Sequence, residues 1–275
     1  MIKHNNRRTF DTYLIRHGQT LDGNNGNVQG SNNGPNNQVL PEGLTEVREN
    51  VITKLIPNLQ GVDPNNIYIY VAGQQRCLDT CGVLMEELMR NNLLKMENVV
   101  FDDRLNGRSY GDLEGLSESK IKSAPYIITH PAKSLSYIKA QLGFENATRI
   151  EPKSDYETRL LTFISDVCNR HGIDHREEQE RNASRPQKDV VIVVGTSDWP
   201  RAVKKSEMLH LFHRFGHETP LDRKAKKIPV PAQGDVMKFD LGLPYQDENG
   251  KVYPLWQMNT EKAKLREELN LQREN

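Results

Sequence analysis

Short apolar runs that stop at a glycine mark the strands that this sequence predicts. The clearest is 189–195, a continuous Val/Ile run typical of a strand buried on both faces of a parallel sheet. Tyr13, Leu14 and Ile15 form a shorter run that stops at Arg16, His17 and Gly18. Further strands are predicted at 66–73, 98–101 and 235–240, and the alternation in the last of these favours an edge strand.

Between these runs the apolar residues recur at helical spacing. A helix is predicted over 45–55 and is expected to end at Pro57, because proline lacks the N–H that a helix interior needs. Other helices are predicted at 77–90, 134–142, 156–170, 200–215 and 260–274. Strands that alternate with helices predict an α/β fold. We expect a three-layer sandwich with a mostly parallel central sheet, helices on both faces and one antiparallel edge strand.

The polar segments predict the domain organisation. Residues 21–39 form a loop crowded with Asn and Gly, which is either functional or mobile, or reflects only the composition of the source. A single domain is expected over 1–258, with an irregular insertion at about 116–188 whose end, 171–188, is an exposed loop. Residues 259–275 are expected to form a C-terminal helical tail.

Composition narrows the possible functions. The 275 residues include 37 acidic and 37 basic ones, so no net field recruits nucleic acid or an anionic membrane. Cys77, Cys81 and Cys168 form neither a C-x-x-C pair nor an even disulfide set, which favours the cytoplasm or another reducing compartment. No apolar run approaches the ~20 residues of a membrane span, and 1–10 has no signal-peptide core.

Basic and nucleophilic residues follow several predicted strands. Arg16, His17 and Gly18 follow the first strand, Arg76 follows the second, and Arg104 and Arg108 lie in the loop after the third. Thr196 and Asp198 follow the Val/Ile strand. Ligands of α/β sheets bind beyond the carboxyl ends of the strands, so this set predicts a site for a phosphate dianion. The alternative for Arg16 and His17 alone is a strand end with two solvated polar residues.

At this point the sequence resembles a known family. Leu14-Ile-Arg-His-Gly-Gln-Thr20 is similar to the Arg-His-Gly signature of the histidine phosphatase superfamily, in its phosphoglycerate-mutase-like branch. The resemblance covers most of the chain through further segments at 28–30, 40–43, 73–80, 104–115 and 228–231.

The resemblance implies a chemistry and a set of roles. His17 would attack phosphorus and become phosphohistidine, and water would then take the phosphoryl group. Arg16 and Arg76, with Gly18, would bind the phosphate oxygens. A second histidine and a carboxylic acid complete the family's site, and neither a metal nor another cofactor is required.

Two positions depart from the family pattern. Thr196 stands where the second histidine is expected, and Gly107 stands where the acid is expected. Loss of one preorganised donor costs ~10²–10³ in rate, and loss of a general acid costs ~10²–10⁴. Glu114, Asp112 or Asp198 could replace the acid, or each is simply a solvated loop carboxylate.

Three hypotheses follow. The chain is a weak phosphohydrolase that uses His17, or a pseudoenzyme that binds a phosphorylated small molecule or phosphopeptide without turnover. The third is a structural or scaffold subunit that binds a protein partner through 260–275 or 171–188. A mutase is less favoured than a hydrolase, because it must handle a twice-phosphorylated substrate in a site that lacks parts.

Overall fold

A central five-stranded sheet organises the chain. The computed structural model describes residues 10–117, 150–172, 189–196, 231–239, 245–246 and 252–253. The strand order is β3-β2-β4-β1-β5. The strands are β1 (Asp11–Arg16), β2 (Ile67–Val71), β3 (Val99–Phe101), β4 (Val190–Gly195) and β5 (Val236–Phe239). The first four are parallel and β5 pairs antiparallel with β1 at the edge, so the predicted mixed sheet is confirmed.

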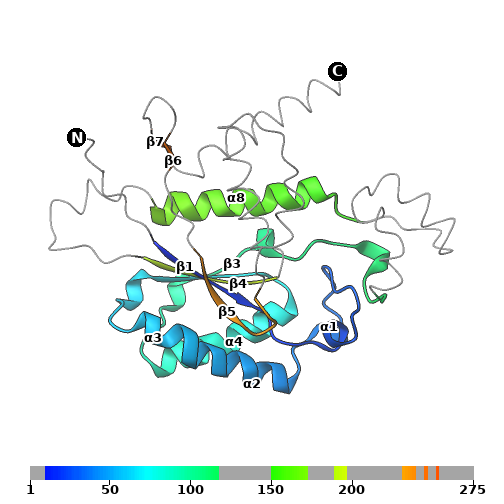
Figure 1. Cartoon of the computed structure of the whole chain (residues 1–275), viewed down its shortest axis with the longest axis horizontal. Coiled ribbons are helices and arrows are strands. Elements are labelled where there is room, and N and C mark those ends of the chain that lie inside the picture. The colour runs from blue at the N-terminus through cyan, green and yellow to red at the C-terminus, as the bar shows by residue number, and fades with distance from the viewer. Residues whose placement is uncertain are drawn as a thin grey trace.

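Helices cover both faces of this sheet. One face carries α2 (Pro41–Asn50), α3 (Ile56–Leu59) and α4 (Gln75–Arg90), and the other carries α8 (Lys153–Gly172) (Figure 1). The three-layer architecture is therefore confirmed. Two features were not predicted: the four-residue α1 (Leu21–Asn24) inside the Asn-rich loop, and a hairpin of β6 (Tyr245–Gln246) and β7 (Val252–Tyr253).

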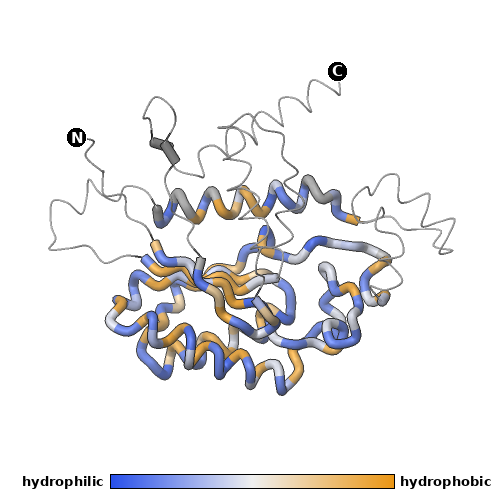
Figure 2. The backbone as a smooth tube through the Cα atoms, viewed as in Figure 1, coloured by the Kyte–Doolittle hydropathy of each residue, from blue (hydrophilic) through white to orange (hydrophobic). Residues whose placement is uncertain are grey.

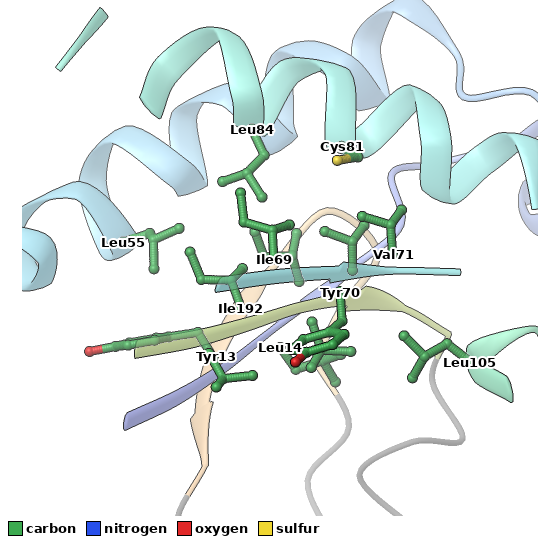
Figure 3. Close-up of a cluster of buried hydrophobic side chains, with 14 of the residues drawn as sticks. Tyr13, Leu14, Leu55, Ile69, Tyr70, Val71, Cys81, Leu84, Leu105 and Ile192 are labelled. Atoms are coloured by element: carbon green, nitrogen blue, oxygen red, sulfur yellow. The ribbon is translucent and has the colours of Figure 1, made fainter. Parts of the chain in front are cut away.

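Apolar residues are concentrated in the strands of the central sheet, as the hydropathy along the backbone shows (Figure 2). Their side chains form one buried cluster with those of the covering helices. Leu55 and Leu84 are fully buried and point from the helices toward Ile69 on the sheet (Figure 3). Leu14 and Tyr70 point from the opposite face of the sheet. This alternation along each strand explains the continuous apolar runs in the sequence.

The helix predicted over 45–55 differs from the prediction at both ends. It begins at Pro41, because proline is well suited to a first helical position. It does not end at Pro57, so that prediction was wrong. Residues Val51–Leu55 form a π-helical turn, in which the N–H of Ile56 donates to the carbonyl of Val51. This wider turn accommodates Pro57, and the helix continues as α3.

His171 was predicted to begin an exposed loop, and the structure corrects this. The residue lies in the last turn of α8 and is buried. Its Nε2 lies 2.9 Å from the hydroxyl of Tyr70, its Nδ1 lies 3.0 Å from a carboxylate oxygen of Asp189, and its ring packs against Tyr68. Two hydrogen-bond partners offset the cost of burying the imidazole.

Other predictions concern parts of the chain outside the described residues. These are the helices at 134–142, 200–215 and 260–274, the remainder of the loop 171–188 beyond 172, and the tail 259–275. Within the described residues, no helix is both long enough and apolar enough to cross a bilayer.

Candidate active site

The register of β1 and β4 places His17 beside Thr196. Arg16 pairs with Gly195, and the N–H of His17 donates to the carbonyl of Gly195 at 3.1 Å. Thr196 is the next residue and is 6% exposed. Its Oγ1 is buried and has no hydrogen-bond partner among the described residues. The two strand ends therefore bring together the predicted nucleophile and the residue that replaces the second histidine.

The environment of His17 fixes its protonation. Its side chain is 3% exposed, and Nδ1 lies 2.9 Å from the carbonyl oxygen of Gly18. A carbonyl only accepts, so Nδ1 carries the hydrogen and Nε2 carries the lone pair. Burial, followed by the charges of Arg76 and Arg16, holds the pKa of His17 well below its ordinary range. These surroundings favour the neutral ring, with its lone pair at Nε2.

Gly18 is required by close packing. A Cβ on this residue would lie 2.6 Å from Cγ1 of Val39 and 3.0 Å from the carbonyl oxygen of Gly43. Its N–H donates to Oγ1 of Thr80 at 3.0 Å, so this donor is already used within the protein. Gly18 therefore fixes the loop after β1 against α2 and α4.

Arg16 connects the end of β1 to the chain that enters β5. Its Nη1 donates to the carbonyl of Pro231 at 3.1 Å, and its own carbonyl accepts from Gly234 at 3.1 Å. The side chain is half-buried next to His17. Arg16 thus adds a permanent positive charge at the position where the sequence predicts one.

Arg76 lies in the first turn of α4 and is 2% exposed. Nη2 donates to the carbonyl of Gly30 at 2.7 Å and to Oε1 of Gln74 at 2.9 Å, and Nη1 donates to the carbonyl of Asn32 at 3.3 Å. Burial lowers the pKa of the guanidinium. Its Nε–H has no partner within the described residues. The predicted second clamp is therefore near His17, but two of its five N–H groups donate to the Asn-rich loop and a third donates to Gln74.

The position expected for the acid is filled by backbone. A Cβ on Gly107 would lie 2.9 Å from the carbonyl oxygen of Gly30 and 3.2 Å from Nη2 of Arg76. The N–H of Gly107 donates to Oε1 of Gln74 at 2.9 Å. Gln74 itself is 2% exposed and also donates to the carbonyl of Gly30 at 2.8 Å. Sequence reasoning missed Gln74, whose only signal was its place two residues before Arg76.

Arg159 of α8 holds this loop and was also missed. Its guanidinium donates to the carbonyls of Arg104, Asn106 and Gly107 at 2.8, 2.6 and 3.2 Å. It also forms a two-pronged ion pair with Glu151, with N···O distances of 2.6 and 2.9 Å. Nothing in the local sequence distinguishes Arg159 from a solvated helix residue.

The other two loop arginines are tied into structural contacts. Arg104 donates to both carboxylate oxygens of Asp102, at 2.9 and 2.6 Å, and pairs with Asp166. Arg108 donates to the carbonyl of Glu151 at 2.8 Å and lies over the ring of Tyr110. Both contribute to the loop between β3 and α8.

The three candidate acids have different surroundings. Oε1 of Glu114 accepts from the N–H of Ser31 at 2.7 Å, from the hydroxyl of Ser31 at 2.9 Å and from the N–H of Tyr110 at 2.9 Å. Glu114 therefore joins the Asn-rich loop to the loop after β3. The backbone of Asp112 lies in a 3-10 turn, Gly111–Leu113, and Asp198 lies outside the described residues.

Comparison with known proteins agrees with this architecture. The model of the histidine phosphatase superfamily (branch 1) matches residues 12–175. No curated protein matches the sequence significantly.

Solved structures of similar fold include three that cover most of the chain. Bacillus stearothermophilus YhfR is 19% identical with a TM-score of 0.51, over 89% of this chain and 94% of that one. A mycobacterial glucosyl-3-phosphoglycerate phosphatase is 17% identical with a TM-score of 0.51, over 89% and 97%. A structure described as mycobacterial hydrolase 2 is 18% identical with a TM-score of 0.53, over 90% and 89%.

Proposed function

Given that this chain belongs to the histidine phosphatase superfamily, we propose that it binds phosphate monoesters and hydrolyses them slowly through His17. The observation that carries the proposal is the state of that side chain. His17 is buried, and its Nδ1 donates to Gly18 while two arginines disfavour protonation. A neutral imidazole with a lone pair at Nε2 is the form that can attack phosphorus.

The reaction proceeds in two displacements. The lone pair of His17 Nε2 attacks phosphorus, the P–O bond to the alcohol breaks, and the leaving oxygen takes a proton from water. A water molecule then attacks the phosphohistidine, the P–N bond breaks, and the electron pair returns to Nε2. The proton lost by this water neutralises the hydroxide that the first step leaves. The positive charges of Arg16 and Arg76 stabilise the negative charge on the transferred phosphoryl group. Such electrostatic stabilisation is the main requirement of this kind of transition state.

Two residues make this reaction slow. Thr196 supplies at most one neutral hydrogen bond where a histidine would supply a charged one, and such a loss costs ~10²–10³ in rate. Gly107 supplies no acid, and that loss costs ~10²–10⁴. The two effects need not multiply, because residues of one site act together.

Binding without turnover is the second candidate, and the residues at positions 196 and 107 favour it. Thr196 and Gly107 stand where the family has groups that assist catalysis, whereas the phosphate-binding candidates Arg16 and Arg76 are present beside His17. The ligand would be a phosphorylated small molecule or a phosphopeptide. A purely structural subunit, partnered through 260–275, is the remaining alternative.

We also expect the protein to occupy a reducing compartment. Cys77 and Cys81 are unpaired and buried, which suits a reducing compartment such as the cytoplasm.

One neighbour is described as a glucosyl-3-phosphoglycerate phosphatase in complex with VO3. At 17% identity this supports the fold and leaves the substrate of the present chain open.

A phosphatase screen tests the proposal. Wild type, His17→Ala and Thr196→His are compared on a panel of phosphate monoesters. We expect slow release by the wild type, none by His17→Ala, and faster release once the second histidine is restored. Phosphate binding with no release by the wild type would favour the second candidate. Equal release by wild type and His17→Ala would overturn any role of this site.

A further inference from the structure

The guanidinium of Arg76 has few donors left for a ligand. An arginine offers five N–H groups, one on Nε and two on each terminal nitrogen. Both hydrogens of Nη2 are used, by the carbonyl of Gly30 and by Oε1 of Gln74. One hydrogen of Nη1 is used by the carbonyl of Asn32. Among the described residues, no acceptor is found for Nε–H or for one hydrogen of Nη1.

The two remaining hydrogens, on Nε and Nη1, do not lie on one edge of the guanidinium, so they cannot bind two oxygens of a phosphate together. A guanidinium binds two oxygens of a phosphate through one of two edges. The end-on edge uses Nη1 with Nη2, and the side-on edge uses Nε with Nη2. Both edges need Nη2, which donates to Gly30 and Gln74. Arg76 therefore cannot bind a phosphate in the two-pronged manner until one of these contacts breaks.

The contacts come from a short segment, residues 28–33, which we call the strap. Gly30 and Asn32 supply the two carbonyls that Arg76 holds. Most of the strap lies at or near the surface, with Val28 as its buried apolar residue. The strap is therefore held over Arg76 mainly by polar contacts.

Two polar side chains fasten the strap from outside. Gln74 donates to the carbonyl of Gly30 at 2.8 Å. Glu114 accepts from the N–H and the hydroxyl of Ser31 at 2.7 and 2.9 Å. Both lie close to Arg76, since the carboxylate of Glu114 contributes to the electrostatics of that guanidinium.

We propose that the strap is an internal competitor for phosphate, which holds Arg76 in a resting state until a phosphate displaces the carbonyls of Gly30 and Asn32. This inference rests on the proposed function of the same site. Displacement frees one hydrogen on each of Nη1 and Nη2, the two nitrogens of the end-on edge. The exchange favours phosphate because both partners are then ionised and the contact can be two-pronged, whereas each displaced carbonyl is neutral and accepts a single bond. Because only molecules with an open strap bind phosphate, the apparent affinity is the affinity of the open form multiplied by the fraction of molecules that are open.

Gly30 offers a way to loosen the strap without a change of charge. It has φ 53°, and a Cβ there would collide with the carboxylate of Glu114. Gly30→Ala therefore pushes Glu114 away from Ser31. Gly26 has φ 65° and open space around its Cβ. Gly26→Ala thus carries a similar backbone strain in the same loop and leaves the contacts of the strap intact.

The test is calorimetric binding of inorganic phosphate to wild type, Gly30→Ala and Gly26→Ala, with hydrogen exchange of the Ser31 amide measured in each. Loss of the Glu114 contacts is expected to tighten phosphate binding by about three- to tenfold in Gly30→Ala relative to Gly26→Ala. Exchange at Ser31 is expected to be faster in Gly30→Ala without phosphate, and faster in the wild type once phosphate is added.

The outcomes separate this inference from the proposed function. If wild type and Gly26→Ala bind phosphate and Gly30→Ala binds it no tighter, the strap does not compete and the inference fails alone. If phosphate slows exchange at Ser31 in the wild type, the strap closes on the ligand and the inference fails as well. If none of the three proteins binds phosphate, the proposed function fails and the inference fails with it.

Discussion

Nδ1 of His17 lies 2.9 Å from the carbonyl oxygen of Gly18, and this contact determines which nitrogen of the ring carries the lone pair. Because the carbonyl must accept, the hydrogen is on Nδ1 and the lone pair is on Nε2. The partner is a backbone atom of the next residue, so the arrangement depends on the path of the chain after β1. Gly18 sets that path through its close contacts with Val39 and Gly43.

The first prediction concerns the pKa of His17. Burial and the charge of Arg76 lower it, so an NMR titration should place it below the ordinary value of about 6.5. Arg76→Met removes the second cause and should raise the pKa of His17 toward that value. Arg104→Met is the matched control, because Arg104 pairs with Asp102 and Asp166 and is not among the causes of the shift. An equal rise in both variants would contradict the assignment.

The same shift has a consequence for stability. A histidine with a lowered folded-state pKa binds more protons when unfolded, so the free energy of unfolding rises with pH below about 6.5 and levels off above it. Urea unfolding of wild type and His17→Gln at several pH values measures this. The variant should lose less stability than the wild type as the pH falls from 6.5 toward the folded-state pKa. Parallel curves over that window would argue against a buried neutral imidazole.

The second prediction concerns the leaving group. With Gly107 in the place of the acid, the leaving oxygen receives no proton from the protein in the step that breaks its bond. Aryl phosphates, which leave as stable phenolates, should therefore react at least ~10²-fold faster than alkyl phosphates, which is the usual worth of a general acid. Steady-state kcat/KM, which reports the step that breaks the P–O bond, is measured for a series of aryl and alkyl phosphates and compared with the acidity of the leaving alcohol. A flat series would mean that another group, such as Glu114, supplies the proton.

The third prediction concerns Arg159, which donates to three carbonyls of the loop 104–107 and pairs with Glu151. Arg159→Met leaves those partly buried acceptors and the carboxylate without their donor. The expected loss is about 2–3 kcal/mol in the free energy of unfolding. Arg90→Met is the control, because that side chain is 60% exposed and its pair with Glu87 is worth at most about 1 kcal/mol. Equal losses in urea unfolding would show that Arg159 is a surface residue in solution.

Much of the fold could be predicted from sequence because the sheet is buried on both faces. The run 189–195 and the run at 13–15 read as strands since every residue faces apolar neighbours, and β4 and β1 confirm both. The end of the helix at Pro57 could not be predicted, because the π-helical turn before it depends on backbone hydrogen bonds that leave no side-chain pattern. His171 was assigned to a loop because its partners, Tyr70 and Asp189, are distant in sequence or lie across an irregular segment.

The candidate site, like the fold, could be predicted from the sequence only in part. Strand order alone indicated that His17 and Thr196 would lie at one edge, and the register of β1 and β4 places them there. The contact of Arg76 with Gly30 could not be predicted, since it joins a side chain to a backbone carbonyl 46 residues away. The sequence leaves the Asn-rich loop as functional, as mobile or as a reflection of source composition, because its position over Arg76 depends on contacts with the distant Gln74 and Glu114.

The most direct test of the account is detection of phosphohistidine at His17. Wild type and His171→Asn are mixed with p-nitrophenyl phosphate, quenched in alkali to preserve the P–N bond, digested and sequenced by mass spectrometry. His171 contacts Asp189, just before the amino end of β4, whereas His17 follows the carboxyl end of the parallel strand β1, so the His171 variant serves as the control. The account predicts a phosphorylated peptide containing His17 in both proteins and none in His17→Ala. Release of p-nitrophenol at an undiminished rate in His17→Ala, with no phosphohistidine in any protein, would contradict it.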